Sequence, residues 1–279
     1  MGYDPEVLKR VRQMNIMDDM MFQKMAEDPG FCEELISTIL EKPVSVVETI
    51  PQNSIKNLQG RSVILDALCS MEDGQLTNVE VQKADDDDHI RRMRYNSACM
   101  IANITNPGDK FEKVPDVCSI FISKFDVFQS NKTIYHVDKM VRETGMHLED
   151  GHRIIYVNTK VNDGSDIAQL MQLFVDNDAY DFKKFPRCSN RKMQFKMTEE
   201  GEAGMCDLVE EYAQKVAKKA AEEAAAEAAK KAAEETAELI RKTTIIKMLK
   251  RGDTIEEIHE IYSDVGEEEI RKMEQEDVK

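Results

Sequence analysis

The sequence predicts an α/β fold with a mixed central sheet flanked by helices and a C-terminal helical extension. Short runs rich in apolar and β-branched residues recur between residues 46 and 158, which is typical of strands. The segment that begins near residue 89 separates two of these runs and provides the helical crossover that parallel strands require. Ala, Glu and Lys then repeat from Val216 to Glu238 without Gly or Pro, which indicates a long helix.

The expected elements begin with a helical N-terminal segment. Strands are expected at residues 46–51, 63–68, 78–82, 115–123, 133–137 and 153–158, and a short helix at 166–177. The composition changes near Thr198, which divides the chain into a domain at residues 1–195, a long helix at 196–242 and a small helical segment at 243–279.

The strand at residues 63–68 is apolar on both faces apart from Asp66, which predicts a central strand covered on both sides. An ionised aspartate in such a place destabilises the fold by roughly several kcal/mol unless it has a partner or a metal ion. Asp66 is therefore a candidate functional residue.

The next strand places polar side chains in a row. Because side chains alternate along a strand, Val79 and Val81 face one side while Asn78, Glu80 and Gln82 face the other. Glu80 therefore supplies a second carboxylate close to Asp66.

The turn between the two strands decides whether these carboxylates meet. A two-residue Asp73-Gly74 loop would pair Asp66 with Val81 and leave Glu80 on the opposite face. A three-residue loop with Gly74 in the left-handed conformation brings Asp66 and Glu80 together. We predict this odd-numbered loop.

An acidic run at residues 85–88 precedes the next helix and is expected to cap it. Arg91 and Tyr95 lie one turn apart on that helix, so they share a face and can reach a phosphate together. Arg92 is expected to be an ordinary exposed residue. In the alternative without a metal, Asp66 and Glu80 are solvated or paired with Arg91 or Arg94.

The order of these residues resembles the PD-(D/E)XK nuclease family transposases, which are also called recombination-promoting nucleases. The stretch from Asn15 to Lys24 is similar to the opening segment of that family. The motif residues that match are Asp66, Glu80, Gln82, Arg91 and Tyr95.

The resemblance implies a restriction-endonuclease-like core and a Mg²⁺-dependent DNA endonuclease that hydrolyses phosphodiester bonds, with a role in recombination. It implies that Asp66, Glu80 and the backbone carbonyl of Val81 hold the ion, with Mn²⁺ as an alternative. Asp66, Glu80 and Gln82 would be the catalytic residues, and Arg91 and Tyr95 would bind phosphate. Oxygen ligands of this kind suit Mg²⁺.

Gln82 departs from the wider superfamily, in which a lysine is usual at this position. An amide cannot act as a base, but it can orient the attacking water by hydrogen bonding. Lys83 follows it on the other face of the strand and is a poor substitute.

Two further classes of function stay open. A transposon-derived fold can serve as a non-catalytic DNA-binding or scaffold protein, and the same residues allow an RNA or nucleotide phosphodiesterase. The net charge of −16 opposes DNA binding. However, acid is concentrated in residues 85–88 and the C-terminal region, while lysines and arginines between residues 110 and 192 can form a local basic rim.

Composition sets the remaining bounds. The six cysteines are scattered without a metal-ligand spacing and are expected to be reduced core residues. No apolar run reaches membrane-spanning length, so no membrane partner is expected. The first residues do not resemble a signal peptide, which favours a cytoplasmic location.

The C-terminal region predicts helices only. The Ala-rich helix is expected to be a spacer, with a homodimer through the C-terminal helices as the alternative. Gly252 should end a helix and Asp253 should cap the next one, and two short helices are expected at 255–262 and 267–271. Their acidic surface favours protein contact or packing over DNA binding.

Overall fold

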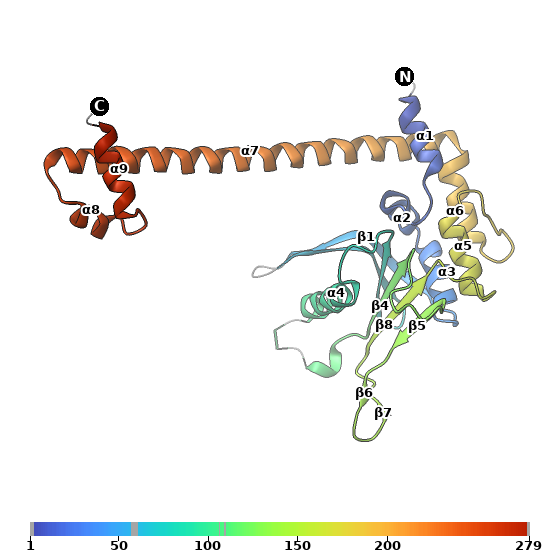
Figure 1. Cartoon of the computed structure of the whole chain (residues 1–279). Coiled ribbons are helices and arrows are strands. Elements are labelled where there is room, and N and C mark those ends of the chain that lie inside the picture. Colours follow the sequence, from blue (N-terminus) through green and yellow to red (C-terminus); the bar gives the residue numbers. More distant parts are fainter. Residues whose placement is uncertain (1–2, 57–60, 106, 109, 278–279) are drawn as a thin grey trace. The chain divides into compact units, whose positions relative to one another are not determined.

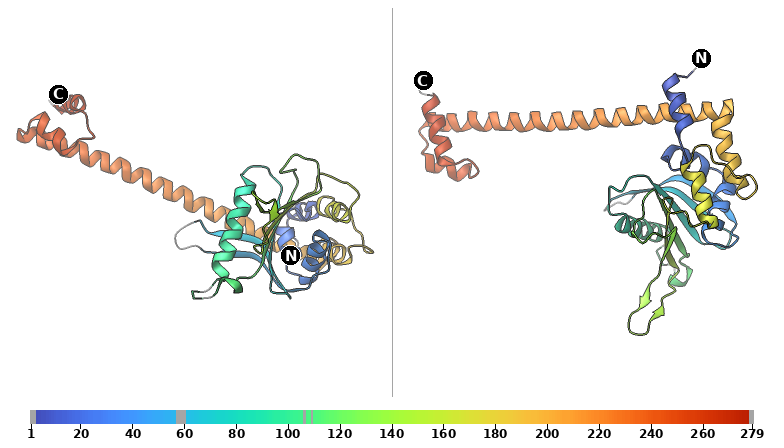
Figure 2. Two further views of the ribbon diagram at one scale, coloured as in Figure 1. Left: turned by 90° about the horizontal axis from the view of Figure 1, so that it is seen from below. Right: turned by 45° about the vertical axis from the view of Figure 1, so that its right-hand side comes forward.

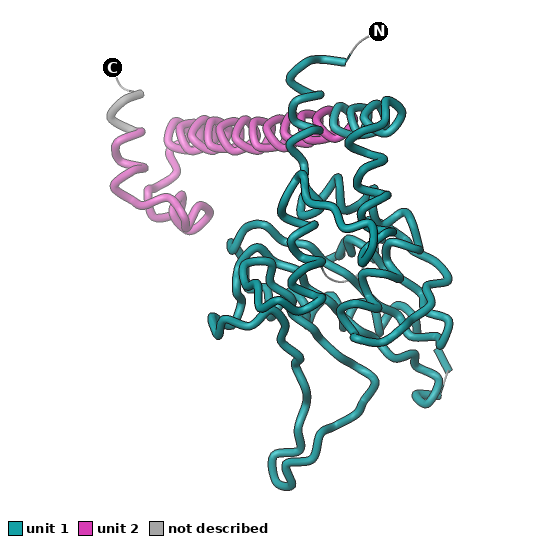
Figure 3. The backbone as a smooth tube through the Cα atoms, turned by 90° about the vertical axis from the view of Figure 1, so that its right-hand side faces the viewer, with its two compact units in different colours: residues 1–210 teal, residues 211–279 magenta. Residues whose placement is uncertain are grey.

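The computed structural model describes residues 3–56, 61–105, 107–108 and 110–277. The chain forms two compact units, Met1–Glu210 and Glu211–Lys279, which Figure 3 shows in different colours.

The bounds of the strands and helices are as follows. The strands are β1 (Val46–Ile55), β2 (Val63–Met71), β3 (Leu76–Gln82), β4 (Val117–Ser123), β5 (Ile134–Val137), β6 (Met140–Val141), β7 (Met146–His147) and β8 (His152–Asn158). The helices are α1 (Pro5–Gln13), α2 (Asp19–Ala26), α3 (Pro29–Ile39), α4 (His89–Ile104), α5 (Asp166–Val175), α6 (Pro186–Met197), α7 (Glu199–Arg251), α8 (Ile255–Ile261) and α9 (Glu267–Asp277). A short 3₁₀ helix spans Phe111–Lys113.

The described strands form a six-stranded mixed sheet in the order β1-β2-β3-β4-β8-β5, with β6 and β7 as a separate ribbon. The predicted α/β class and the six predicted strands are confirmed, although β1 extends further than expected. β3 and β4 are parallel, as are β4 and β8. The crossover through α4 was predicted, whereas α6 and the β6–β7 ribbon were not.

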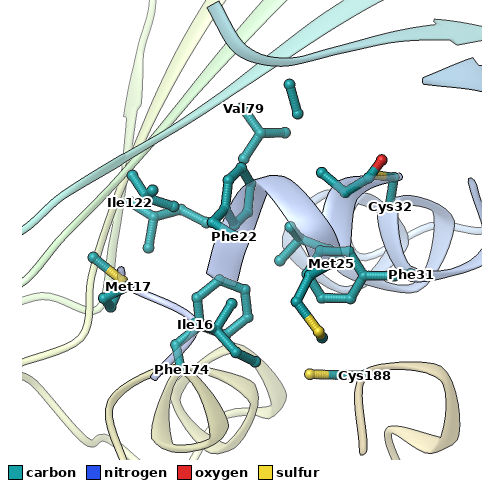
Figure 4. Packing of buried hydrophobic residues seen from close by; sticks show 14 of the residues in the cluster. Ile16, Met17, Phe22, Met25, Phe31, Cys32, Val79, Ile122, Phe174 and Cys188 are labelled. Atoms are coloured by element: carbon teal, nitrogen blue, oxygen red, sulfur yellow. The ribbon is translucent and has the colours of Figure 1, made fainter. Parts of the chain in front are cut away.

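Helices cover both faces of the sheet (Figures 1 and 2). The larger core lies between the sheet and the helices α1, α2, α3, α5 and α6. Phe31 occupies its middle, with its ring 6.2 Å from the rings of Phe22 and Phe174. Val79 and Ile122 enter this core from the sheet (Figure 4).

The opposite face of the sheet meets α4. Met93 of this helix packs against Phe121 of β4 and Tyr156 of β8. The side chain of Asp88 accepts a hydrogen bond from the Arg91 amide and so caps the first turn of α4. The predicted acidic cap is therefore confirmed at its last residue.

The prediction that both faces of β2 are covered was wrong in one place. β2 lies between β1 and β3, yet the Ile64 side chain is 56% exposed. The reason is a groove between this part of β2 and α4, lined on one side by residues 61–64. An apolar strand sequence does not distinguish a covered position from one that borders a groove.

The cysteines behave as the sequence predicted. All six lie in the described residues, where each is buried and free of a disulfide. In the described part of the chain, no helix has both the length and the apolar character that a membrane span needs.

The second unit contains the larger part of α7, with α8 and α9. Every side chain from residue 210 to residue 240 is exposed. The end of α7 and the two short helices surround a small core of Ile245, Ile258 and Ile270. The predicted Asp253 cap was wrong, because Thr254 caps α8 in a capping box with Glu257.

Candidate active site

The turn between β2 and β3 has the predicted odd number of residues. The ladder pairs Ser70 with Leu76 and Ala67 with Val79, so residues 72–74 form the loop. Gly74 has a φ of +86°, a conformation that glycine adopts without strain. In this register the next two residues along the strands are Asp66 and Glu80.

The Asp66 side chain lies just beyond the last backbone pair between β2 and β3, which joins Ala67 and Val79. Its Oδ2 atom accepts a hydrogen bond of 3.0 Å from the amide of Val81. Because this amide would otherwise pair along the strand, the bond fixes the Asp66 side chain beside β3.

Glu80 is fully buried on the α4 side of the sheet. Its Oε1 atom accepts a hydrogen bond of 2.9 Å from the side-chain amide of Asn78. The side chain of Asn96 on α4 also hydrogen-bonds to it. The polar row predicted for this strand therefore faces α4, while Val79 and Val81 face the larger core.

The carboxylates resist ionisation together. Burial, followed by the nearby charge of Glu80, raises the pKa of Asp66 to about 8. Burial also raises the pKa of Glu80, against the opposing effects of Asn78 and Arg92. Asp19 at the start of α2 adds a third negative charge that raises the pKa of Asp66. A bound cation would relieve this repulsion.

Arg92 is the functional candidate that sequence reasoning missed. Its Nη1 atom lies 3.2 Å from Oε1 of Gln82, and its Nη2 atom lies 3.5 Å from Oε2 of Glu80. The prediction that Arg92 is an ordinary exposed residue was wrong, because its side chain is only 33% exposed. Nothing in the local sequence distinguishes Arg92 from its exposed neighbours, because its orientation depends on which face of α4 packs on the sheet.

Gln82 and Lys83 point to different partners. The Gln82 side-chain amide donates to the backbone carbonyl of Ala84 and, at 3.3 Å, to Asp86. Lys83 forms an ion pair with Asp18, just before α2.

Arg91 and Tyr95 do not contact Asp66 or Glu80 in the described structure. Arg91 forms a 3.1 Å ion pair with Asp88, and the Tyr95 hydroxyl donates to the backbone carbonyl of Arg61. Both residues line the groove between β2 and α4, whose volume is about 650 Å³. Arg92 also lines this groove and connects it to Glu80.

The residues at this site suit a hard cation in charge and in ligand type. The described residues contain no group of three or more His, Cys, Asp or Glu side chains placed to hold a metal. However, Mg²⁺ commonly uses only one or two protein carboxylates, and Asp66 and Glu80 supply two. The buried Oδ1 atom of Asn78 has no hydrogen-bond partner in the described structure and is a further oxygen beside Glu80.

A comparison with protein families decides the relationship. The model of the PD-(D/E)XK nuclease family transposases matches residues 19–244, which is more than half of the chain. The chain belongs to this family. A search of curated proteins and a search of solved structures found no match. The match confirms the family resemblance, and it includes the β2–β3 hairpin and α4 of this chain.

Proposed function

We propose that this PD-(D/E)XK family transposase is a metal-dependent DNA endonuclease that hydrolyses phosphodiester bonds. The observation that carries the proposal is the odd-numbered loop that places Asp66 opposite Glu80. Family membership supports the same class of chemistry.

The carboxylates of Asp66 and Glu80 and the backbone carbonyl of Val81 would hold Mg²⁺, or Mn²⁺ in its place. When bound, such an ion lowers the pKa of a water molecule and polarises the phosphoryl oxygen. The Val81 amide keeps the Asp66 carboxylate in position, and Asn78 does the same for Glu80.

Other side chains of the site would position the reacting groups. Gln82 would orient the attacking water by hydrogen bonding, because its amide cannot accept the proton as a base. Arg92, which touches both Gln82 and Glu80, would hold these two residues in register with each other. It is therefore a positioning residue in this proposal.

The DNA strand would approach through the groove between β2 and α4. Arg91 would contact a phosphate there, and Tyr95 would shape the wall beside it. The lining contains four arginines and two aspartates, so the groove carries a local positive charge on a chain whose net charge is −16. This local charge supports the proposal of a phosphate substrate for a chain of acidic composition.

The test is cleavage of supercoiled plasmid by the full chain with Mg²⁺ or Mn²⁺. We expect nicking or linearisation by the wild type and its loss in Asp66→Asn and Glu80→Gln. Glu143→Gln on the exposed β6–β7 ribbon is the matched control and should cut normally. Absence of cleavage with either metal, together with DNA binding that survives EDTA and Asp66→Asn, would favour a non-catalytic DNA-binding or scaffold protein.

A further inference from the structure

We propose that the groove between β2 and α4 binds an unpaired nucleotide, so that the chain acts on single-stranded or locally opened DNA in preference to intact duplex. This inference rests on the proposed nuclease function and names its substrate class.

The groove offers two kinds of surface side by side. Its charged wall includes several arginines, and its apolar wall includes Ile64 and Tyr95. The described residues that line it are Arg61, Ser62, Val63, Ile64, Asp87, Asp88, Arg91, Arg92, Arg94, Tyr95 and Asn96. Its volume of about 650 Å³ lies within the range of small-molecule sites. A nucleotide has the matching chemistry, with an anionic phosphate and an apolar base face.

The aromatic wall is held in a fixed orientation. The Tyr95 hydroxyl donates to the backbone carbonyl of Arg61, so the ring is tied at both ends while 37% of the residue stays exposed. Because this hydroxyl is used in the protein, the ring face is the part of Tyr95 that best serves a ligand. Aromatic side chains in grooves stack on bases of any sequence.

Ile64 extends the apolar wall. It is 56% exposed on a strand that lies inside the sheet, at the position where the sequence predicted full coverage. A base in a continuous duplex is stacked on its neighbours and cannot present its face to this wall. An unpaired base can, and that difference selects the substrate.

Arg94 adds to the groove a positive charge that no carboxylate of the described residues neutralises. Arg91 is already paired with Asp88, and Arg92 with Glu80. Arg94 is exposed and has no ion pair within the described residues. Arg92 and Asn96 line the groove and also contact Glu80, so a nucleotide in the groove would lie next to the carboxylate pair.

The experiment measures binding in EDTA, where cleavage does not interfere. Fluorescence anisotropy of the full chain would compare a labelled DNA duplex, the same duplex with a central unpaired bubble, the corresponding single strand and a single-stranded RNA of the same sequence. We expect the wild type to bind the bubble and the single strand about tenfold more tightly than the duplex.

Variants assign this preference to the groove. Tyr95→Leu should abolish it, whereas Tyr95→Phe should keep it because the ring remains. Ile64→Ser changes an exposed side chain and tests the same wall if Tyr95→Leu does not fold. Arg94→Gln should weaken binding of every DNA form and reduce the salt dependence by about one phosphate contact. Arg10→Gln, on the exposed side of α1, is the matched control. It should change neither the preference for unpaired DNA nor the salt dependence of binding.

Several results would overturn the inference. Equal affinity for the bubble and the duplex would refute the inference. Plasmid cleavage that still depends on Asp66 would then leave the proposed nuclease function intact. Tighter binding of the RNA strand than of the DNA strand would show that RNA, and not DNA, is the substrate class. Absence of binding to any DNA would remove the inference, while plasmid cleavage with Mg²⁺ or Mn²⁺ tests the proposed function separately.

Discussion

Replacement of Asp66 by asparagine should stabilise the metal-free protein at alkaline pH. Asparagine keeps an oxygen that can accept the Val81 amide proton, a bond of 3.0 Å in the wild type, but it carries no charge. The variant therefore isolates the electrostatic penalty of the carboxylate from its structural role.

The magnitude follows from the pKa. The pKa of Asp66 rises from 3.8 to about 8 because of burial and of Glu80. The folded state thus retains a proton that the unfolded state releases above about pH 4. The wild type loses stability as pH rises through this window, and the loss is complete above about pH 8. At about 1.4 kcal/mol per pKa unit, the rise from 3.8 to about 8 sets an upper limit of about 6 kcal/mol. Solvent screening at this half-buried residue reduces our expectation to about 2 kcal/mol.

The assay is thermal unfolding of both proteins in EDTA at about pH 4, close to the ordinary pKa of an aspartate, and at about pH 8.5. We expect the Tm of Asp66→Asn to exceed that of the wild type by about 4–8 °C at the higher pH, and by much less at the lower pH. Addition of Mg²⁺ at the higher pH should raise the Tm of the wild type and reduce the difference. A difference in Tm that is the same at both pH values would refute the reasoning, because it would show that the carboxylate has no raised pKa.

Three further predictions concern other parts of the first unit. Gly74→Ala should lower the free energy of unfolding by about 1 kcal/mol through backbone strain alone, since nothing lies within 4 Å of the added Cβ. Gly204→Ala in helix α7, where the added Cβ also meets nothing, should raise the free energy of unfolding by up to about 1 kcal/mol. Urea unfolding measures both changes. Lys192→Met should lower the free energy of unfolding by about 3 kcal/mol, because the buried ammonium donates to three backbone carbonyls near the end of α5; an unchanged urea midpoint would contradict this. Arg92→Gln should reduce kcat for DNA cleavage by about tenfold or more, whereas Arg91→Gln should mainly raise KM; equal effects on kcat would argue against the positioning role of Arg92.

Local chemistry made much of the candidate site predictable. The alternation along β3 identifies the row that contains Glu80, and the position of Gly74 identifies the loop that brings Asp66 to it. Both inferences use only neighbouring residues and the period of a strand. The capping of α4 by Asp88 and the crossover between β3 and β4 were predictable for the same reason.

The contacts of Arg92 and Ile64 were not predictable in this way. An arginine near a helix N-terminus is expected to be solvated unless the packing face of the helix is known. Only the packing of α4 on the sheet directs Arg92 toward Glu80. The sequence predicts a buried Ile64, because it does not show which part of β2 the helix α4 covers. The third carboxylate, Asp19, comes from a helix far from β2 in the sequence.

By itself, the sequence determined the α/β class, the six strands of the main sheet, the burial of the cysteines and the register that places Asp66 beside Glu80. These properties depend on residue type and on short-range geometry. Only the tertiary structure decided which arginine meets the carboxylates, that Asp19 adds its charge to theirs, and that a groove with an aromatic and a basic wall opens next to them. Those properties depend on how helices pack on the sheet, and packing joins residues whose separation along the chain leaves no local pattern.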